Sequence, residues 1–202
     1  MEIRTLRADE IDCRVQSVKA GRNGQVGAVL LLYKDARADM KILDETFGMF
    51  GWSREHTEIS GNLFCTIRIK NPDSGEWVAK QDVGTESNQD AQKGEASDAF
   101  KRAATNVGIG RELYTSPFIY VVLDKGEYWD DKGKLKASQS LKFTVSEISY
   151  NKDRVIDKLM LKDGKGQARF TFYNKESTQA PTKRTDGRDI FETAVQNESR
   201  HQ

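Results

Sequence analysis

Lys101 and Arg102 stand next to each other in the segment "KGEASDAFKRAATNVGIGRELY". Adjacent cations of this kind can hold an anion such as a phosphate group through charge-assisted hydrogen bonds. They can equally form an ordinary solvated patch, because Asp98 stands four residues before Arg102, the spacing at which opposite charges on a helix neutralise each other. The residues by themselves leave both interpretations open.

The residues around this pair have the period of an amphipathic helix. The apolar positions that recur at helical spacing are Ala96, Ala99, Phe100, Ala103, Ala104 and Val107. The pattern predicts a helix that starts near Asn88 and ends at Gly108. Lys101 and Arg102 then lie on the face opposite the apolar stripe, where a partner can reach them.

Catalytic and nucleotide-binding patterns have few candidate residues in this chain. The two cysteines, Cys13 and Cys65, lie far apart, and with only two histidines neither a zinc site nor a Ser-His-Asp triad is expected. The phosphate-binding pattern G-x-x-x-x-G-K-[ST] does not occur, so ATP use is not expected. We therefore expect a protein that is not an enzyme, with no catalytic residues, no metal site and no cofactor.

A run of acidic residues offers one route to metal-dependent chemistry. It contains Asp35, Asp39, Asp44 and Glu45, and a nuclease would need such groups to converge on Mg²⁺. In a helix over residues 34–48 these carboxylates fall on the polar side, among Lys34, Arg37 and Lys41. This arrangement favours a solvated, ion-paired face.

Composition limits the class of protein. The chain has 202 residues, of which 37% are hydrophobic and 31% charged, which is typical of a soluble folded protein. The net charge is only +1, so an anionic partner would have to be bound by a local cluster of cations. No apolar run approaches the ~20 residues of a membrane span, and "MEIRTLRADE" has no hydrophobic segment of a signal peptide. We expect a cytoplasmic protein with no membrane partner.

Strand patterns surround the two predicted helices. Residues 11–33 predict a β-hairpin, and residues 52–84 predict three antiparallel strands separated by Gly61-Asn62 and by "NPDSG". In the middle strand one face is apolar, and the other carries Arg68 and Lys70. The order of elements predicts an α+β fold, in which an antiparallel β-β-β-α core follows a β-hairpin and a helix.

The rest of the chain divides by composition. We expect the core domain to span residues 1–124, and residues 125–140, which are polar and turn-rich, to form a linker or an exposed loop. Three alternating segments in residues 141–174 predict a C-terminal β-meander, whose pairing with the first sheet the sequence does not decide. Residues 175–202 are expected to be a flexible tail.

The run "DVGTESNQDAQKGEASDAFKRAATNVGIGRELY", with "FGMFGW" and three strands before it, resembles the Rad-fifty-two family of single-strand DNA annealing proteins. It is most similar to the bacteriophage branch, which includes Sak-type annealing proteins. The resemblance covers about residues 33–117. Its most specific pieces are Asp82-Val83-Gly84, Lys93-Gly94 and the Lys101-Arg102-Ala103 run with its glycine-rich end.

This resemblance implies an annealing core in residues 1–124 that assembles into a homo-oligomeric ring, with single-stranded DNA in a positive groove around the outside. The implied activity is ATP-independent annealing of complementary strands in phage-type homologous recombination and repair, inside the bacterial host cell. Thr105 stands where a further family arginine would lie, and Arg37 and Lys41 are our substitutes for another. The expected DNA-binding residues are Lys101, Arg102, Lys93, Arg37, Lys41, Arg68 and Lys70.

Two other functions remain open at this stage. The protein could be a single-strand protector that covers DNA without annealing it, or a metal-dependent nuclease that uses the acidic helix. A host single-strand DNA-binding protein is a candidate partner. The apolar segment "DIFETAVQ" in the tail is expected either to pack on its own domain or to fold onto that partner as a docking peptide.

Overall fold

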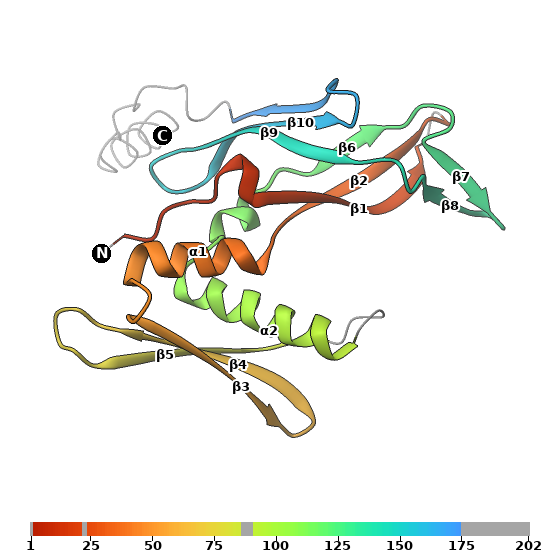
Figure 1. The fold of residues 1–202 in the computed structure, drawn as a ribbon. Helices are drawn as coiled ribbons and strands as arrows, with labels where there is room; N and C mark the ends of the chain where they lie inside the picture. The colour runs from red at the N-terminus through yellow and green to blue at the C-terminus, as the bar shows by residue number, and fades with distance from the viewer. Residues whose placement is uncertain (1, 22–23, 86–90, 175–202) are drawn as a thin grey trace, which may run out of the picture.

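The computed structural model describes residues 2–21, 24–85 and 91–174, and the side chains of all of these except residues 91–93. In Figure 1 a large sheet lies above two helices, and a smaller sheet lies below them. The large sheet has six strands in the order β11-β10-β9-β1-β2-β6. Its strands are β1 (Ile11–Ala20), β2 (Val26–Lys34), β6 (Ile119–Val122), β9 (Phe143–Tyr150), β10 (Ile156–Asp163) and β11 (Ala168–Tyr173).

The lower layer is the three-stranded antiparallel sheet β3-β4-β5. Its strands are β3 (Trp52–Ile59), β4 (Asn62–Lys70) and β5 (Trp77–Val83). Helix α2 (Ala91–Val107) packs on this sheet, and helix α1 (Ala36–Phe47) lies between α2 and the upper sheet (Figure 1). Two short 3₁₀ helices, η1 (Ala8–Glu10) and η2 (Arg111–Thr115), contact strands β9 and β10 of the upper sheet. The α+β class, with a β-β-β-α unit after a hairpin and a helix, is confirmed.

Local chemistry explains where the two helices start and stop. Asp35 caps α1, since its side chain accepts a hydrogen bond from the Arg37 amide at 2.6 Å. Gly48 ends α1 with φ of 76°, a positive value that glycine adopts without strain. Gly108 ends α2 in the same way, as predicted, with φ of 124°. The predicted start at Asn88 lies outside the described residues.

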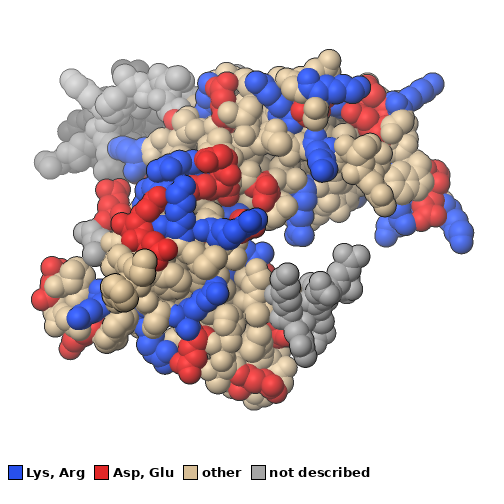
Figure 2. Space-filling model, viewed as in Figure 1, with Lys and Arg blue, Asp and Glu red and all other residues tan. Residues whose placement is uncertain are grey.

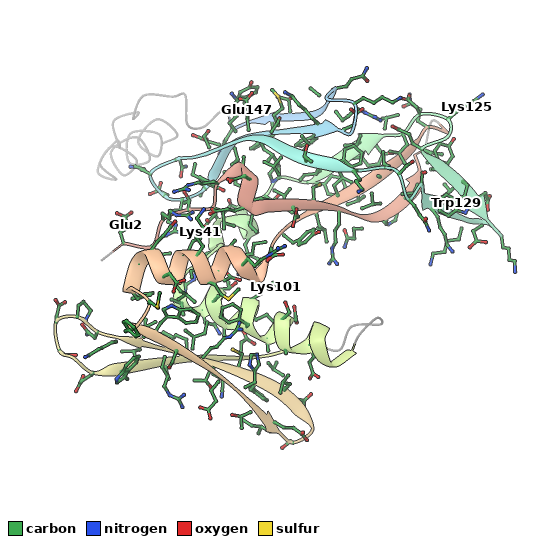
Figure 3. The ribbon with its side chains drawn as sticks, viewed as in Figure 1. Glu2, Lys41, Lys101, Lys125, Trp129 and Glu147 are labelled. Carbon is green, nitrogen blue, oxygen red and sulfur yellow. The ribbon has the colours of Figure 1, made fainter. Side chains whose placement is uncertain are left out.

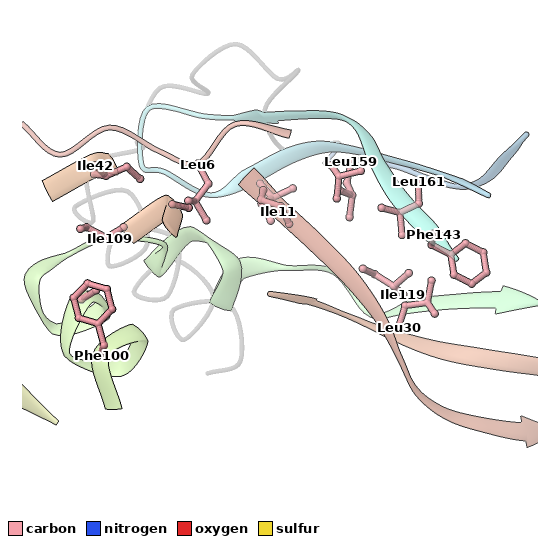
Figure 4. Close-up of a cluster of buried hydrophobic side chains, with 14 of the residues drawn as sticks. Leu6, Ile11, Leu30, Ile42, Phe100, Ile109, Ile119, Phe143, Leu159 and Leu161 are labelled. Atoms are coloured by element: carbon pink, nitrogen blue, oxygen red, sulfur yellow. The ribbon is translucent and has the colours of Figure 1, made fainter. Parts of the chain in front are cut away.

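One hydrophobic core joins the two sheets through the helices (Figure 4). Phe100 of α2 is buried, and its ring stacks on Trp52 of β3 with centroids 6.3 Å apart. At the other end of the core, Leu30 and Ile119 pack with Leu159 from the C-terminal strands. The site elements are therefore fixed by side chains from both layers.

The C-terminal meander is part of the upper sheet, which the sequence left undecided. Strand β9 pairs with β1 through Asp12–Thr144 and Cys13–Phe143. The sheet curls enough for its two edge strands, β11 and β6, to approach each other. A hydrogen bond of 2.8 Å from Arg169 of β11 to the carbonyl of Val122 in β6 joins them. The hairpin and the meander thus share one core.

Residues 125–140 contain more structure than the expected linker or exposed loop. They form a two-stranded hairpin, β7 (Tyr128–Asp131) and β8 (Lys134–Ala137). Lys132 and Gly133 both have positive φ, which gives the tight turn that the twist of a two-residue hairpin requires. The tail over residues 175–202 lies outside the described residues.

Candidate nucleic-acid interface

Residues of β2, α2 and η2 line a cleft of about 340 Å³. Its lining is Leu31, Leu32, Tyr33, Lys34, Asp98, Lys101, Arg102, Thr105, Gly110, Leu113 and Tyr114. Cations and aromatic rings thus share one depression. Over the whole view in Figure 2 positive and negative side chains are interspersed, which agrees with the net charge of +1, so a local site of this kind is what a polyanion would need.

Lys101 projects from α2 on the side that faces α1 and the upper sheet (Figure 3). Its ammonium group forms no ion pair with any residue that the structure describes. Its backbone carbonyl, in contrast, is tied down, since it accepts hydrogen bonds from Lys34 Nζ at 3.1 Å and from Thr105 Oγ1 at 3.0 Å. The cation is therefore available on a fixed backbone.

Arg102 is exposed on the next position of the helix, and its nearest anion is Asp82 at the end of β5. Arg102 Nε lies 3.2 Å from Asp82 Oδ1, and 48% of the arginine side chain is exposed. Asp98, which the helical spacing indicated as the neutralising residue, instead accepts two hydrogen bonds from Thr85. A guanidinium has five N–H donors, so the single ion pair with Asp82 leaves other donors for a ligand.

Below these cations the structure buries an ion pair that the sequence analysis placed on a solvated face. Asp39 is fully buried, and its carboxylate pairs with Lys34, which β2 brings from outside the helix. The helical wheel alone could not show this partner, so the assignment of Asp39 to the solvated side was wrong. Burial raises the pKa of Asp39 to about 6 against the opposing effect of Lys34. Burial lowers the pKa of Lys34.

This pair is packed tightly against the start of η2. A Cβ atom on Gly110 would lie 2.6 Å from both Cδ and Cε of Lys34, so the lysine stem passes directly over this glycine. Asp39 Oδ2 has no hydrogen-bond partner in the described structure. The pair fixes α1, α2 and η2 relative to one another beneath the cleft.

The other expected basic residues of α1 lie outside this cleft. Arg37 forms two hydrogen bonds of 3.0 Å with Asp35, and its side chain is exposed at the start of the helix. Lys41 lies on the side of α1 that faces the N-terminal segment (Figure 3), where its Nζ is 3.3 Å from Oε1 of Glu10. Both residues line a separate depression, together with Asp9, Glu10, Asp12 and Asp35. The neighbourhood of these two cations is acidic.

Arg68 and Lys70 lie on the face of the lower sheet that points away from α2. Their neighbours Cys65 and Ile67 are fully buried under the helix, which leaves the alternate residues on the opposite side. Arg68 pairs there with Glu55 at 2.8 Å. The side chain of Lys93 lies outside the described residues. Of the six expected residues whose side chains the structure describes, it therefore brings together only Lys101 and Arg102, with Lys34 beneath them.

The sequence analysis did not assign the aromatic residues of the cleft. Tyr33 is the last residue but one of the apolar strand β2, and Tyr114 follows the glycine-rich stop of α2. Both are exposed to solvent. One sequence feature could have identified Tyr114 as a site residue. It stands one turn beyond the Gly108–Gly110 stop, where the chain has to turn back toward the basic helix.

The acidic residues of α1 have separate partners. Asp35 binds Arg37, Asp39 binds Lys34, Asp44 accepts a 2.7 Å hydrogen bond from the Trp52 indole, and Glu45 binds Arg4. Among residues 2–21, 24–85 and 91–174, no group of three or more His, Cys, Asp or Glu side chains is placed to hold a metal ion. No helix in the same part of the chain is long and apolar enough to cross a bilayer.

The chain is similar to known proteins of DNA repair and DNA binding. The model of a family described as Rad52/22 family double-strand break repair protein matches residues 4–130, which include the whole cleft. The chain belongs to the Rad52/22 family. It is also 39% identical over 92 residues to the single-stranded DNA-binding protein DdrA of Deinococcus radiodurans. That match covers 45% of this chain and 43% of the relative, so the chain matches less than half of the length of this curated relative.

Proposed function

We propose that the protein binds single-stranded DNA in the cleft of Lys101 and Arg102 and anneals complementary strands without ATP, in homologous recombination and repair. The observation that carries the proposal is one depression that holds an exposed guanidinium, two exposed tyrosines and an ammonium with no ion-pair partner among the described residues. Membership of a double-strand break repair family supports it. So does the name of the Deinococcus relative, a single-stranded DNA-binding protein.

The arrangement can promote pairing by binding and ordering alone. Lysine and arginine contact phosphates without reading the sequence of the bases. A strand fixed in this way has already lost much of its conformational freedom, which lowers the entropic barrier to meeting its complement. No bond is formed or broken, and no cofactor enters the reaction.

Assembly into a homo-oligomeric ring is part of this proposal. Each protomer supplies a short basic site on a protein of net charge +1, and repetition around a ring would join these sites into a continuous track. Strands β3 and β5 are the edges of the lower sheet and are open to pairing with a neighbour. We place the chain near the Sak-type phage branch, with a host single-strand DNA-binding protein as a candidate partner.

The central test is a strand-annealing assay with two complementary oligonucleotides, one labelled, in the absence of ATP. We expect duplex formation to be faster with protein than without it over a range of protein-to-nucleotide ratios. Slower pairing together with tight strand binding would identify a protector instead. Absence of binding to either strand would reject the proposed function.

Releasing Arg102 from its anion should strengthen DNA binding. Asp82→Asn removes the charge that holds the guanidinium, so we expect the affinity for single-stranded DNA to rise by roughly 2- to 5-fold, on the order of one modest exposed ion pair. Fluorescence anisotropy with a labelled oligonucleotide measures the change.

Glu55→Gln provides the matched control for this variant. It changes the net charge by the same amount and releases Arg68 on the opposite face of the lower sheet. Its affinity should equal that of the unmodified protein. An equal gain in both variants would show that net charge is responsible, and would remove the special role of Arg102.

A further inference from the structure

The cleft of Lys101 and Arg102 opens onto a surface of exposed apolar side chains. Tyr114 is 82% exposed and Phe118 is 74% exposed, and both are large rings. Leu31, Tyr33 and Val122 are also open to solvent. Exposed apolar side chains that gather in this way mark a surface that binds something.

Strand geometry places Leu31, Tyr33 and Val122 on one face. In β2, Leu30 is buried in the core, so Leu31 and Tyr33 point outward on either side of Leu32. In β6, Ile119 and Val121 are buried, which turns Tyr120 and Val122 to the same outer face as Val29 and Gly27. The ring of Tyr120 lies across Gly27, where a Cβ atom would be 2.2 Å from it. The outer surface of β2 and β6 is thus lined with aromatic and aliphatic groups.

Tyr114 stands on a rigid support. The neighbouring Glu112 is fully buried, where it accepts a hydrogen bond from the Leu6 amide at 2.7 Å and one from Arg154 at 3.0 Å. Thr115 Oγ1 accepts a hydrogen bond from the amide of Ile156 at 2.9 Å. These contacts anchor one side of η2, and they leave Tyr114 on the other side, in the wall of the cleft.

Cations lie around the exposed rings. Lys101 and Arg102 line the same cleft as Tyr33 and Tyr114. The guanidinium of Arg14 lies 5.8 Å from the centroid of the Tyr33 ring. Aromatic faces beside cations suit a ligand that combines flat apolar groups with negative charge, which is the chemistry of a single nucleic-acid strand.

We propose that Tyr114 and Tyr33 form a stacking platform for the bases of the strand whose phosphates bind Lys101 and Arg102. This inference rests on the proposed function and adds a direct contact with bases to it. Every base has a π-face, so such a platform holds the strand without selecting a sequence. Because the tyrosines belong to β2 and η2 while the cations belong to α2, the strand lies between the upper sheet and the helix.

The test compares Tyr114→Ala with Tyr114→Phe on two probes, an oligothymidine and a strand of the same length made of abasic sites. Tyr114→Ala should weaken binding of the oligothymidine by roughly 5- to 150-fold, the range for loss of one base–aromatic stack. Tyr114→Phe retains the ring and should bind like the unmodified protein. On the abasic strand, which has phosphates but no bases, all three proteins should bind alike.

Phe50→Ala serves as the matched control, since this ring is 90% exposed but lies in the turn between α1 and β3, outside the cleft. It should leave the affinity for both probes unchanged. The salt dependence of Tyr114→Ala should also stay unchanged, because the phosphate contacts remain.

Three results would overturn the stacking platform. The first is unchanged affinity of Tyr114→Ala for the oligothymidine, and the second is an equal loss on the abasic strand. The third is a smaller assembly of Tyr114→Ala than of the unmodified protein, measured by light scattering without DNA. That result would show that a second copy of the chain covers Tyr114. If the unmodified protein binds neither probe, the proposed function fails, and the platform fails with it.

Discussion

Replacing Lys34 with alanine should reduce the free energy of unfolding by about 3–5 kcal/mol at pH 8, the range for breaking a buried ion pair. The variant leaves the Asp39 carboxylate buried without its only ion-pair partner among the described residues. It also removes the lysine stem that packs on Gly110 and the donor to the Lys101 carbonyl. Urea unfolding followed by circular dichroism measures the loss.

The loss of stability caused by Lys34→Ala should depend on pH in a defined direction. The pKa of Asp39 is raised to about 6 in the folded protein, above the ordinary value of 3.8. A carboxyl group of this kind binds its proton more tightly when folded, so protonation favours the folded state as the pH falls through 6 toward 4. The destabilisation caused by Lys34→Ala should therefore be smaller at pH 5 than at pH 8.

Two further variants isolate the effect of burial. Lys158→Ala breaks a solvent-exposed pair with Glu147 and should cost no more than about 1 kcal/mol. The double variant Lys34→Met/Asp39→Leu removes both buried charges, and its stability should return close to that of the unmodified protein. If Lys34→Ala costs no more than Lys158→Ala, the buried pair has no special structural role.

Local signals in the sequence account for most of the fold. The cap at Asp35, the stop at Gly48 and the turns around Gly61 and Gly75 are short-range features, and the elements that they bound appear at the predicted places. The pairing of β9 with β1 joins residues more than a hundred positions apart. Such a contact depends on packing of the whole core, which no local pattern encodes.

The same limit explains the errors in the candidate site. Asp39 lies on a helix whose wheel gives it a polar side, but its partner comes from β2, and only the tertiary structure brings the two together. Arg68 was grouped with Lys101 because each belongs to a basic face. A helix that packs on a sheet by its apolar stripe leaves the polar face of the helix and that of the sheet on opposite sides, so these faces cannot form one surface.

Simultaneous replacement of Lys101 and Arg102 by alanine should weaken binding of single-stranded DNA about 25-fold at 0.1 M monovalent salt. Each phosphate contact on a single strand contributes about 0.7 to the slope of log affinity against log salt, so two lost contacts reduce the slope by about 1.4. From 1 M to 0.1 M salt, which is one log unit, this difference in slope amounts to a factor of 10 to the power 1.4 in affinity, or about 25. Both side chains lie on the open face of α2, so the melting temperature should change little.

The matched control removes two cations from the opposite face of the lower sheet. Arg68→Ala/Lys70→Ala makes the same change in net charge, and it should leave both the affinity and the salt slope intact. Anisotropy titrations at four or five salt concentrations give the slopes. An unchanged slope in the Lys101/Arg102 variant would return that pair to a solvated patch. A reduced slope in the Arg68/Lys70 variant alone would place the strand on the outer face of β4. The two double variants therefore decide which of the two basic faces binds the phosphates.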